Sequence, residues 1–204
     1  MSLVILDYGI GNLRSVQKAF EKVGAAALIT SDPQRIAEAT HVVLPGVGAF
    51  CDCMDKFTAA QLREPVLAHI QQDKPFLGIC VGMQMLLTTG HENGLHAGLG
   101  IFEGEVIRFP TVESYKVPHM GWNQAVLKNG DTFWNGLPHP AWYYFVHSYY
   151  CVPKDRSLVA LETDYIAPFC AALQRGRLLA TQFHPEKSQQ AGLELLRKFV
   201  RSGL

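Results

Sequence analysis

The stretch Pro75-Phe76-Leu77-Gly78-Ile79-Cys80-Val81-Gly82 joins a short apolar run to the pattern Gly-x-Cys-x-Gly. This pattern predicts a strand that turns sharply into a helix, with Cys80 at the turn in the place that serine takes in Gly-x-Ser-x-Gly. The strained backbone of such an elbow exposes the nucleophile, and the flanking glycines let strand and helix cross without a Cβ clash. Cys80 is therefore a candidate nucleophile.

Short apolar runs alternate with amphipathic stretches around this elbow, which is typical of βαβ units on a largely parallel sheet. The strands that we expect in this pattern are 3–7, 26–30, 41–44 and 178–183. The expected helices are 12–23, 32–39, 65–72, 81–87 and 193–200. Further β-like runs, partly antiparallel, are expected at 104–109, 123–127, 143–152 and 158–162. We predict one α/β domain over residues 1–204, with an open, mostly parallel central sheet flanked by helices and a partly antiparallel β extension in the second half.

The composition is that of a globular domain with one sizeable core: 204 residues, 48% of them hydrophobic and 18% charged. Eighteen basic residues balance eighteen acidic ones. This balance, without blocks of like charge, argues against a nucleic-acid or anionic-membrane partner. The apolar run from Leu3 to Leu6 has no basic leader and is far shorter than the roughly 18 residues of a membrane span, so a cytoplasmic location is expected.

The remaining cysteines and the histidines suggest no second site. The five cysteines are odd in number and lack zinc or redox spacing, which favours reduced thiols over a disulfide framework. The eight histidines are scattered without metal-ligand spacing. We expect no metal and no cofactor.

A base and a carboxylate occur far downstream in Phe183-His184-Pro185-Glu186. A thiol near its ordinary pKa of about 8.5 is only a few per cent thiolate at neutral pH, so an imidazole held by an acid is the expected activator. His184 and Glu186 are two residues apart, and on an extended segment they would point the same way. Taken singly, Gly-x-Cys-x-Gly is more often a tight turn with a buried cysteine, and His-Pro-Glu is commonly a surface turn.

The positions of these features favour an active site over two unrelated turns. Open parallel sheets bind ligands at the carboxyl ends of their strands, and the elbow, His184 and the loop Pro45-Gly46-Val47-Gly48 all follow strands. The backbone N–H of Val81 and an N–H of the glycine-rich loop are candidate oxyanion donors. Together the features predict acyl transfer by cysteine, histidine and glutamate.

Two other stretches have more than one interpretation. The loop Gly9-Ile10-Gly11-Asn12-Leu13-Arg14 follows a strand and opens a helix, as dinucleotide-binding loops do, but Arg14 stands where the third glycine belongs. We prefer a surface loop shaped for a partner. The aromatic run Trp142-Tyr143-Tyr144-Phe145 is typical of a strand in the core and would also suit an interface.

The elbow Gly78–Gln84 and the segment His184-Pro185-Glu186 resemble those of the class I, triad-type glutamine amidotransferases, and the resemblance spans essentially the whole chain. One group of glutaminase subunits in this family is similar in further segments: 7–13, 44–50, 118–123, 145–149 and 183–188. The resemblance implies that the chain hydrolyses glutamine and passes ammonia to a separate cyclase subunit. That subunit would form imidazole glycerol phosphate and aminoimidazole carboxamide ribotide in histidine biosynthesis.

The resemblance also assigns roles to residues of this chain. It implies that Cys80, His184 and Glu186 form the catalytic triad. It places Val81, Gly48 and Val47 at the oxyanion site. It implies that the substrate's charged head is recognised by Gln84, Glu92 and the backbone of Ser148 and Tyr149. It places Asn12, Trp122, Tyr144 and Lys187 at the interface with the cyclase.

Three alternatives remain open. The chain could be a glutaminase subunit of the same family that serves a different synthase, although segments 118–123 and 145–149 argue against this. It could be a thiol hydrolase or peptidase on a similar sheet, which would need no contact from Gln84 to a glutamine head group. It could also be a non-catalytic module that binds a nucleotide or a partner.

Overall fold

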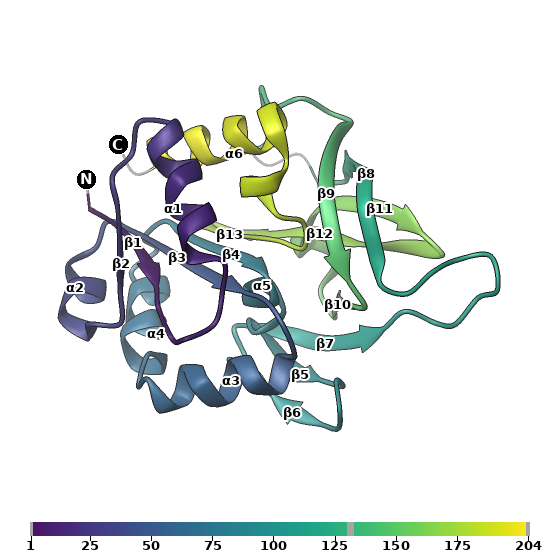
Figure 1. Cartoon of the computed structure of the whole chain (residues 1–204), viewed down its shortest axis with the longest axis horizontal. Helices are drawn as coiled ribbons and strands as arrows, with labels where there is room; N and C mark the ends of the chain where they lie inside the picture. The colour runs from purple at the N-terminus through teal and green to yellow at the C-terminus, as the bar shows by residue number, and fades with distance from the viewer. Residues whose placement is uncertain (1, 130–132, 203–204) are drawn as a thin grey trace.

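The computed structural model describes residues 2–129 and 133–202. A central sheet forms the middle layer, with helices α1 (Leu13–Lys22) and α6 (Gln189–Arg201) on one face and α3 (Phe50–Ala59) and α4 (Arg63–Gln71) on the other (Figure 1). The expected class, an α/β sheet flanked by helices and extended by antiparallel strands, is confirmed.

The central sheet has nine strands in the order β2-β1-β3-β4-β13-β12-β11-β8-β9, and its first five strands are parallel. The parallel half consists of β2 (Ala27–Thr30), β1 (Leu3–Leu6), β3 (His41–Gly46), β4 (Phe76–Cys80) and β13 (Leu178–Thr181). Strands β1, β3, β4 and β13 are buried throughout, as expected of parallel strands with both faces covered by helices, whereas the edge strand β2 is partly exposed. All four pairs between them run the same way, so their carboxyl ends share one edge.

Antiparallel strands extend this sheet beyond β13. They are β12 (Ala167–Arg175), β11 (Val159–Tyr165), β8 (His119–Leu127) and β9 (Ala141–His147). A second, four-stranded sheet has the order β10-β7-β5-β6. Its strands are β10 (Tyr149–Pro153), β7 (Phe102–Arg108), β5 (Leu87–Gly90) and β6 (His96–Ala97).

The remaining helices are short: α2 (Pro33–Glu38), α5 (Val81–Gln84) and the 3₁₀ turns η1 (Arg156–Leu158) and η2 (Pro185–Lys187). Helix α1 buries Val16 and Phe20, as its period predicted, and the Phe20 ring packs 6.2 Å from Phe199 of α6. Asp32 caps α2 by accepting the N–H of Gln34, and Pro33 takes the first helical position, where its missing N–H costs nothing.

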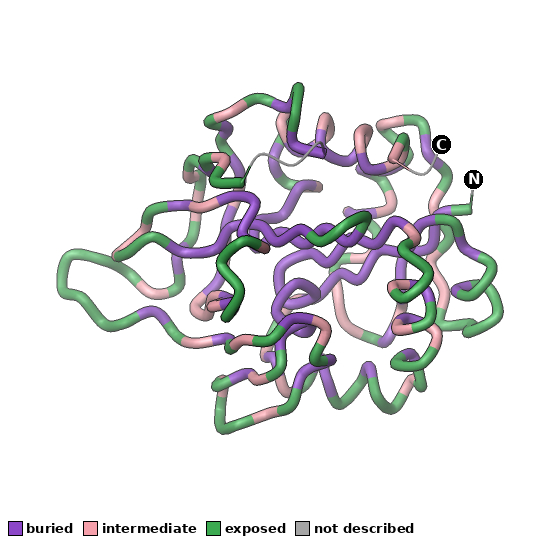
Figure 2. Tube along the Cα trace, turned by 180° about the vertical axis from the view of Figure 1, so that it is seen from behind, coloured by how far each residue is buried: buried purple, intermediate pink, exposed green. Residues whose placement is uncertain are grey.

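The core runs through the middle layer, where Figure 2 shows the strands as a nearly continuous buried band between exposed outer segments. It joins the two halves of the sheet through aromatic contacts. Phe183, just after β13, stacks on Tyr143 of β9 with ring centroids 3.9 Å apart, and Phe145 packs edge-on against Phe183. The segment that leads to His184 is thereby held against β9.

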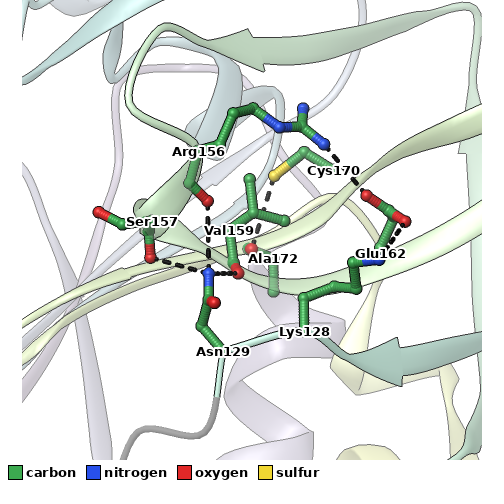
Figure 3. Close-up of polar contacts among 8 residues, drawn as sticks. All are labelled: Lys128, Asn129, Arg156, Ser157, Val159, Glu162, Cys170 and Ala172. Atoms are coloured by element: carbon green, nitrogen blue, oxygen red, sulfur yellow. Dashed lines mark hydrogen bonds and ion pairs between the residues drawn. The ribbon is translucent and has the colours of Figure 1, made fainter.

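The far end of β8 is tied to η1 and β11 by polar contacts (Figure 3). The side-chain amide of Asn129 lies 2.8 to 3.3 Å from the carbonyl oxygens of Arg156, Ser157 and Val159. Glu162 forms ion pairs of 3.1 Å with both Lys128 and Arg156. These contacts fix β8 at the end opposite to the active site.

Several predicted boundaries were wrong. The elbow helix, expected at 81–87, ends at Gln84, and Leu87 already begins β5. The expected strand 143–152 is two strands, because the chain leaves the central sheet after His147 and enters the second sheet at Tyr149. The expected strand 178–183 ends at Thr181. Helix α3 and strands β5, β6 and β12 were not predicted.

The elbow crosses β3 so closely that only glycine fits at residue 82. A Cβ added to Gly82 would lie 1.9 Å from the carbonyl oxygen of Leu44, far inside van der Waals contact. Gly82→Ala is therefore expected to lower the free energy of unfolding by about 3 kcal/mol, the upper range for overpacking. Urea denaturation followed by circular dichroism measures this loss.

Gly24→Ala is the control for this prediction. Gly24 follows α1 with φ of +86° and has open space around the added Cβ, so only the backbone conformation is penalised. We expect a loss of about 1 kcal/mol there. If Gly82→Ala cost no more than Gly24→Ala, the close crossing at the elbow would be wrong.

Candidate active site

Cys80 ends β4 and caps α5 with φ of +55° and ψ of −111°. This positive φ is strained for a residue with a side chain and is typical of functional positions. The neighbouring glycines allow the strands and the helix to approach closely at this turn. A Cβ on Gly78 would lie 3.0 Å from the Gly82 carbonyl oxygen, and one on Gly46 would lie 2.8 Å from the Gly82 nitrogen. The predicted elbow geometry is present.

His184 and Glu186 form a buried pair beside Cys80. Nδ1 of His184 lies 2.7 Å from Oε1 of Glu186, and the two side chains are 2% and 1% exposed. Glu186 lies in the 3₁₀ turn η2 that begins at Pro185, so the extended backbone that we expected at this point is wrong. The turn still brings the carboxylate to the imidazole. Two hydrogen bonds hold the backbone of His184 at the start of the turn. Its N–H donates to the Tyr144 carbonyl at 3.0 Å, and its carbonyl accepts from Ser188 Oγ at 2.6 Å.

Electrostatics favour the charged form of His184. Burial lowers its pKa, but the Cys80 thiolate and the carboxylate of Glu186 raise it by more, to about 10. Nε2 of His184 is buried and has no well-aligned hydrogen-bond partner among the described residues. The Nδ1–Glu186 contact turns this nitrogen away from the carboxylate, so it is the ring atom left to exchange a proton with the thiol.

A cavity of about 270 Å³ opens in front of Cys80 and His184. Its walls include these predicted residues: Val47, Gly48, Val81, Gln84, Glu92, Ser148, Tyr149 and Lys187. Pro118, Val146 and His147 complete the lining, and none of these three was predicted to be a site residue. A larger cavity, of about 730 Å³, lies at α6 and the β12–β13 turn and contains none of the predicted site residues.

Gln84 is held in the cavity wall by two hydrogen bonds. Its Nε2 donates to the Tyr149 carbonyl at 3.0 Å and to Oε1 of Gln182 at 3.1 Å. Because both amide hydrogens are used, Oε1 of Gln84 is the atom that can accept a hydrogen bond from a ligand's ammonium group. Gln182 in turn places its Nε2 3.7 Å from the Cys80 sulfur.

Sequence reasoning missed Gln182. The residue is fully buried just before His184, in contact with both the nucleophile and Gln84. Its signal was present: a neutral polar side chain in the otherwise apolar run Leu178–Phe183 must find a hydrogen-bond partner when buried.

The glycine-rich loop and Glu92 meet at the start of α3. Oε2 of Glu92 accepts the backbone N–H of Phe50 at 2.7 Å, at the amino end of the helix. The Val47 carbonyl lies 3.4 Å from the Cys53 sulfur and so faces α3. Gly48 has φ of +91°, a conformation that glycine adopts without strain. Val47 and Gly48 of this loop line the cavity together with Val81.

Three of the predicted interface residues are in contact. The rings of Trp122 and Tyr144, opposite each other on β8 and β9, lie 6.2 Å apart, and Nζ of Lys187 lies 5.7 Å from the centre of the Tyr144 ring. Trp122 is 43% exposed. Asn12 is exposed at the amino end of α1, which packs against η2, the turn that contains Lys187.

Residues 2–129 and 133–202 contain no group of three or more His, Cys, Asp or Glu side chains that could hold an ion.

Comparison with known proteins gives a consistent family. The family model of glutamine amidotransferase class-I matches residues 4–202. The chain is 54% identical over 202 residues to "Imidazole glycerol phosphate synthase subunit HisH" of Syntrophotalea carbinolica, covering 97% of this chain and 98% of that protein. The protein of the same name from Geobacter sulfurreducens is 51% identical, with 97% of each chain covered.

Solved structures share the fold at much lower identity. A structure described as a glutamine amidotransferase superposes with a TM-score of 0.73 and 16% identity over 99% of each chain. PurLQS from Thermotoga maritima also gives a TM-score of 0.73, with 18% identity over 99% of this chain and 97% of that one.

Proposed function

The chain belongs to the class I glutamine amidotransferase family, and from this membership we propose that Cys80, His184 and Glu186 are its catalytic triad. The observation that supports the triad is the strained Cys80 facing a cavity that it shares with His184, whose ring is held by the buried carboxylate of Glu186. Acting as the glutaminase subunit of an imidazole glycerol phosphate synthase, the chain hydrolyses glutamine to glutamate and ammonia. A cyclase subunit uses the ammonia in histidine biosynthesis.

The reaction follows from the charge state of the triad. The Cys80 thiolate attacks the carbonyl carbon of the glutamine side-chain amide, and Nε2–H of His184 protonates the nitrogen that leaves as ammonia. This step leaves a thioester on Cys80 and a neutral imidazole. His184 then takes a proton from water, whose oxygen attacks the thioester and releases glutamate. The thiolate and imidazolium are thereby restored.

Neighbouring groups hold the substrate in this scheme. The N–H groups of Val81 and of the Val47–Gly48 segment are proposed to stabilise the oxyanion formed during each attack. Oε1 of Gln84, the carboxylate of Glu92 and the backbone of Ser148 and Tyr149 are proposed to bind the charged head of glutamine. Glu186 fixes the His184 tautomer that leaves Nε2 toward the thiol.

We propose that residues 1–204 form a single glutamine amidotransferase domain and that the protein is cytoplasmic. One continuous nine-stranded sheet, with strands from both halves of the chain, supports a single domain. The biosynthetic role supports the location. No helix in residues 2–129 or 133–202 is both long and apolar enough to cross a membrane.

Glutamate release from glutamine, measured with and without the purified cyclase subunit, tests the function. We expect release that the cyclase subunit and its substrate increase. A thiol hydrolase or peptidase would show no preference for glutamine, and a binding module would release no glutamate under either condition. Formation of the imidazole product distinguishes this subunit from one that serves another synthase.

Truncation of the aromatic pair formed by the exposed Trp122 and the half-buried Tyr144 should uncouple the two reactions. Trp122 and Tyr144 lie beside Lys187 of the cavity wall, so a partner that receives ammonia from the cavity should cover them. Trp122→Ala and Tyr144→Ala are each expected to weaken the complex by about 2 kcal/mol, or roughly 30-fold in Kd. Alternatively they raise the ratio of glutamate to imidazole product above one.

The control for this prediction is Leu28→Ala. Leu28 is 49% exposed on β2, at the opposite edge of the sheet from β9. We expect its Kd and product ratio to match the parent's, and free ammonium should still support the cyclase with every variant. If both aromatic variants bound as tightly as the parent with a ratio near one, the interface would lie on another face.

A further inference from the structure

The proposed reaction does not use two buried histidines, of which one lines the cavity and the other lies behind it. His119 of β8 and His147 of β9 are opposite each other in the sheet, with exposed fractions of 4% and 6%. Nδ1 of His119 lies 3.3 Å from Nε2 of His147. Nδ1 of His147 lies 2.9 Å from the carbonyl oxygen of Tyr149. The pair therefore touches the backbone segment proposed to bind the head of glutamine.

The contacts allow only one arrangement of hydrogens. The Tyr149 carbonyl can only accept, so Nδ1 of His147 carries a hydrogen. Burial lowers the pKa of His147 to about 3 and that of His119 to about 4, so both rings are neutral near neutral pH. Nε2 of a neutral His147 is then an acceptor, and Nδ1–H of His119 must donate to it.

Asn123 fixes the other end of this chain of hydrogen bonds. Its Oδ1 accepts the backbone N–H of Gln124 at 2.8 Å, which orients the amide. Nδ2 then donates to the Asp164 carbonyl at 2.9 Å and to Nε2 of His119 at 3.3 Å. Along this chain Asn123 donates to His119, His119 donates to His147, and His147 donates to the Tyr149 carbonyl. This direction of donation fixes the tautomer of both imidazoles.

The Tyr149 carbonyl connects this chain to the nucleophile. It accepts from His147 and also from Nε2 of Gln84, at 3.0 Å. The same Nε2 reaches Gln182, whose amide lies 3.7 Å from the Cys80 sulfur. A wrong His147 tautomer would put a lone pair against the Tyr149 carbonyl and release the backbone that holds Gln84.

We propose that His119 and His147 are positioning residues for glutamine binding. His119 fixes the tautomer of His147, His147 holds the Tyr149 carbonyl, and this carbonyl holds the amide of Gln84. The inference rests on the proposed glutaminase function. Both ring nitrogens of His147 are occupied, by His119 and by the Tyr149 carbonyl, so neither histidine is free to exchange a proton in the reaction. Their loss should therefore affect substrate binding more than the chemical step.

Packing and hydrogen bonding of His119 can be separated by substitution. Its ring lies between two others, 4.0 Å from the Tyr165 centroid and 5.0 Å from that of Phe145. His119→Phe keeps a ring in this stack but removes the donor to His147. His119→Asn loses the stack but retains the donor, because the asparagine Nδ2 takes the place of the histidine Nδ1.

The two variants should therefore rank differently in two measurements. The kinetics of both are measured in the complex with saturating cyclase subunit. His119→Phe is expected to raise the KM for glutamine about tenfold, because the loss of one buried hydrogen bond usually has an effect of this size. Its kcat should stay within about threefold of the parent's. His119→Asn should keep KM within about threefold of the parent. In thermal unfolding, His119→Asn should have the lower Tm.

His41→Phe provides the matched control. His41 is also buried and packs edge-on against Phe199, but it lies at the amino end of β3, away from the cavity. Its KM should equal the parent's. If KM followed Tm across the three variants, or if His119→Phe kept the parent's KM, the tautomer lock would be wrong. Absence of glutaminase activity in the parent complex would instead overturn the proposed function.

Discussion

Cys80→Ala is expected to abolish the release of glutamate from glutamine, with a loss of about 10⁴-fold or more, because no thioester can form without the thiol. The fold should persist, since alanine removes only the sulfur atom from the elbow. Binding to the cyclase subunit should also persist, because Cys80 lines the cavity rather than the Trp122–Tyr144 surface. Single-turnover assays in the presence of the cyclase measure the loss.

Cys51→Ala is the control for the nucleophile. Cys51 is partly exposed on α3 and lines no part of the active-site cavity. The other thiols are buried, as Cys80 is, but none of them lines the active-site cavity. Burial raises the pKa of Cys53 to about 11 and that of Cys151 well above its usual value. Iodoacetamide should therefore inactivate through Cys80 alone. Inactivation that correlates with modification of any other cysteine would contradict this assignment.

The sequence predicted those parts of the fold whose pattern is local. Strands β1, β3 and β4 are apolar runs buried on both faces, and α1 has a clear helical period that ends at Gly24. The second half was harder, because its strands alternate between two sheets. Nothing local to Ser148 shows that β9 and β10 belong to different sheets; only long-range pairing of β9 with β8 and of β10 with β7 decides this.

Helix α3 was missed for a similar reason. It has no side-chain cap from its own sequence, and its first N–H is satisfied by Glu92, 42 residues away. The elbow helix was predicted too long because Met83, Met85 and Leu86 continue an apolar run that a helix tolerates. In the structure these residues are buried, and the carbonyls of Met85 and Leu86 accept the N–H groups of Leu99 and Phe102 instead of continuing the helix.

The candidate site shows the same division. Cys80 and the His184–Glu186 segment carry motifs, and the carboxyl-end rule predicted that they meet. Gln182 lies in no motif, and His119 and His147 lie in segments whose resemblance assigned them no role. Their roles depend on hydrogen bonds between β8, β9, β13 and α5, which follow from the strand order β13-β12-β11-β8-β9 and cannot be deduced from spacing in the chain.

Replacement of the base and the orienter of the proposed triad should give losses that do not add. His184→Ala is expected to reduce kcat by about 10⁴-fold, because neither the thiolate nor the leaving ammonia then has a proton partner. Glu186→Gln should cost about 10²-fold, since the imidazole remains but is poorly oriented. The double variant should resemble His184→Ala alone, because Glu186 acts only through His184. A double-mutant cycle on kcat measures this coupling.

The pH profile gives an independent test of the same arrangement. The carboxylate of Glu186 helps to raise the pKa of His184 to about 10, and the reaction needs the imidazolium, so activity of the parent should fall only as pH rises toward that value. Without the charge in Glu186→Gln, the His184 pKa falls and the alkaline limb of kcat must move to lower pH. Losses that multiply in the double variant would mean that Glu186 acts independently of His184. An unmoved limb would mean that Glu186 does not set the charge of His184. The 2.7 Å contact between Nδ1 and Oε1 would then orient the ring without setting its charge.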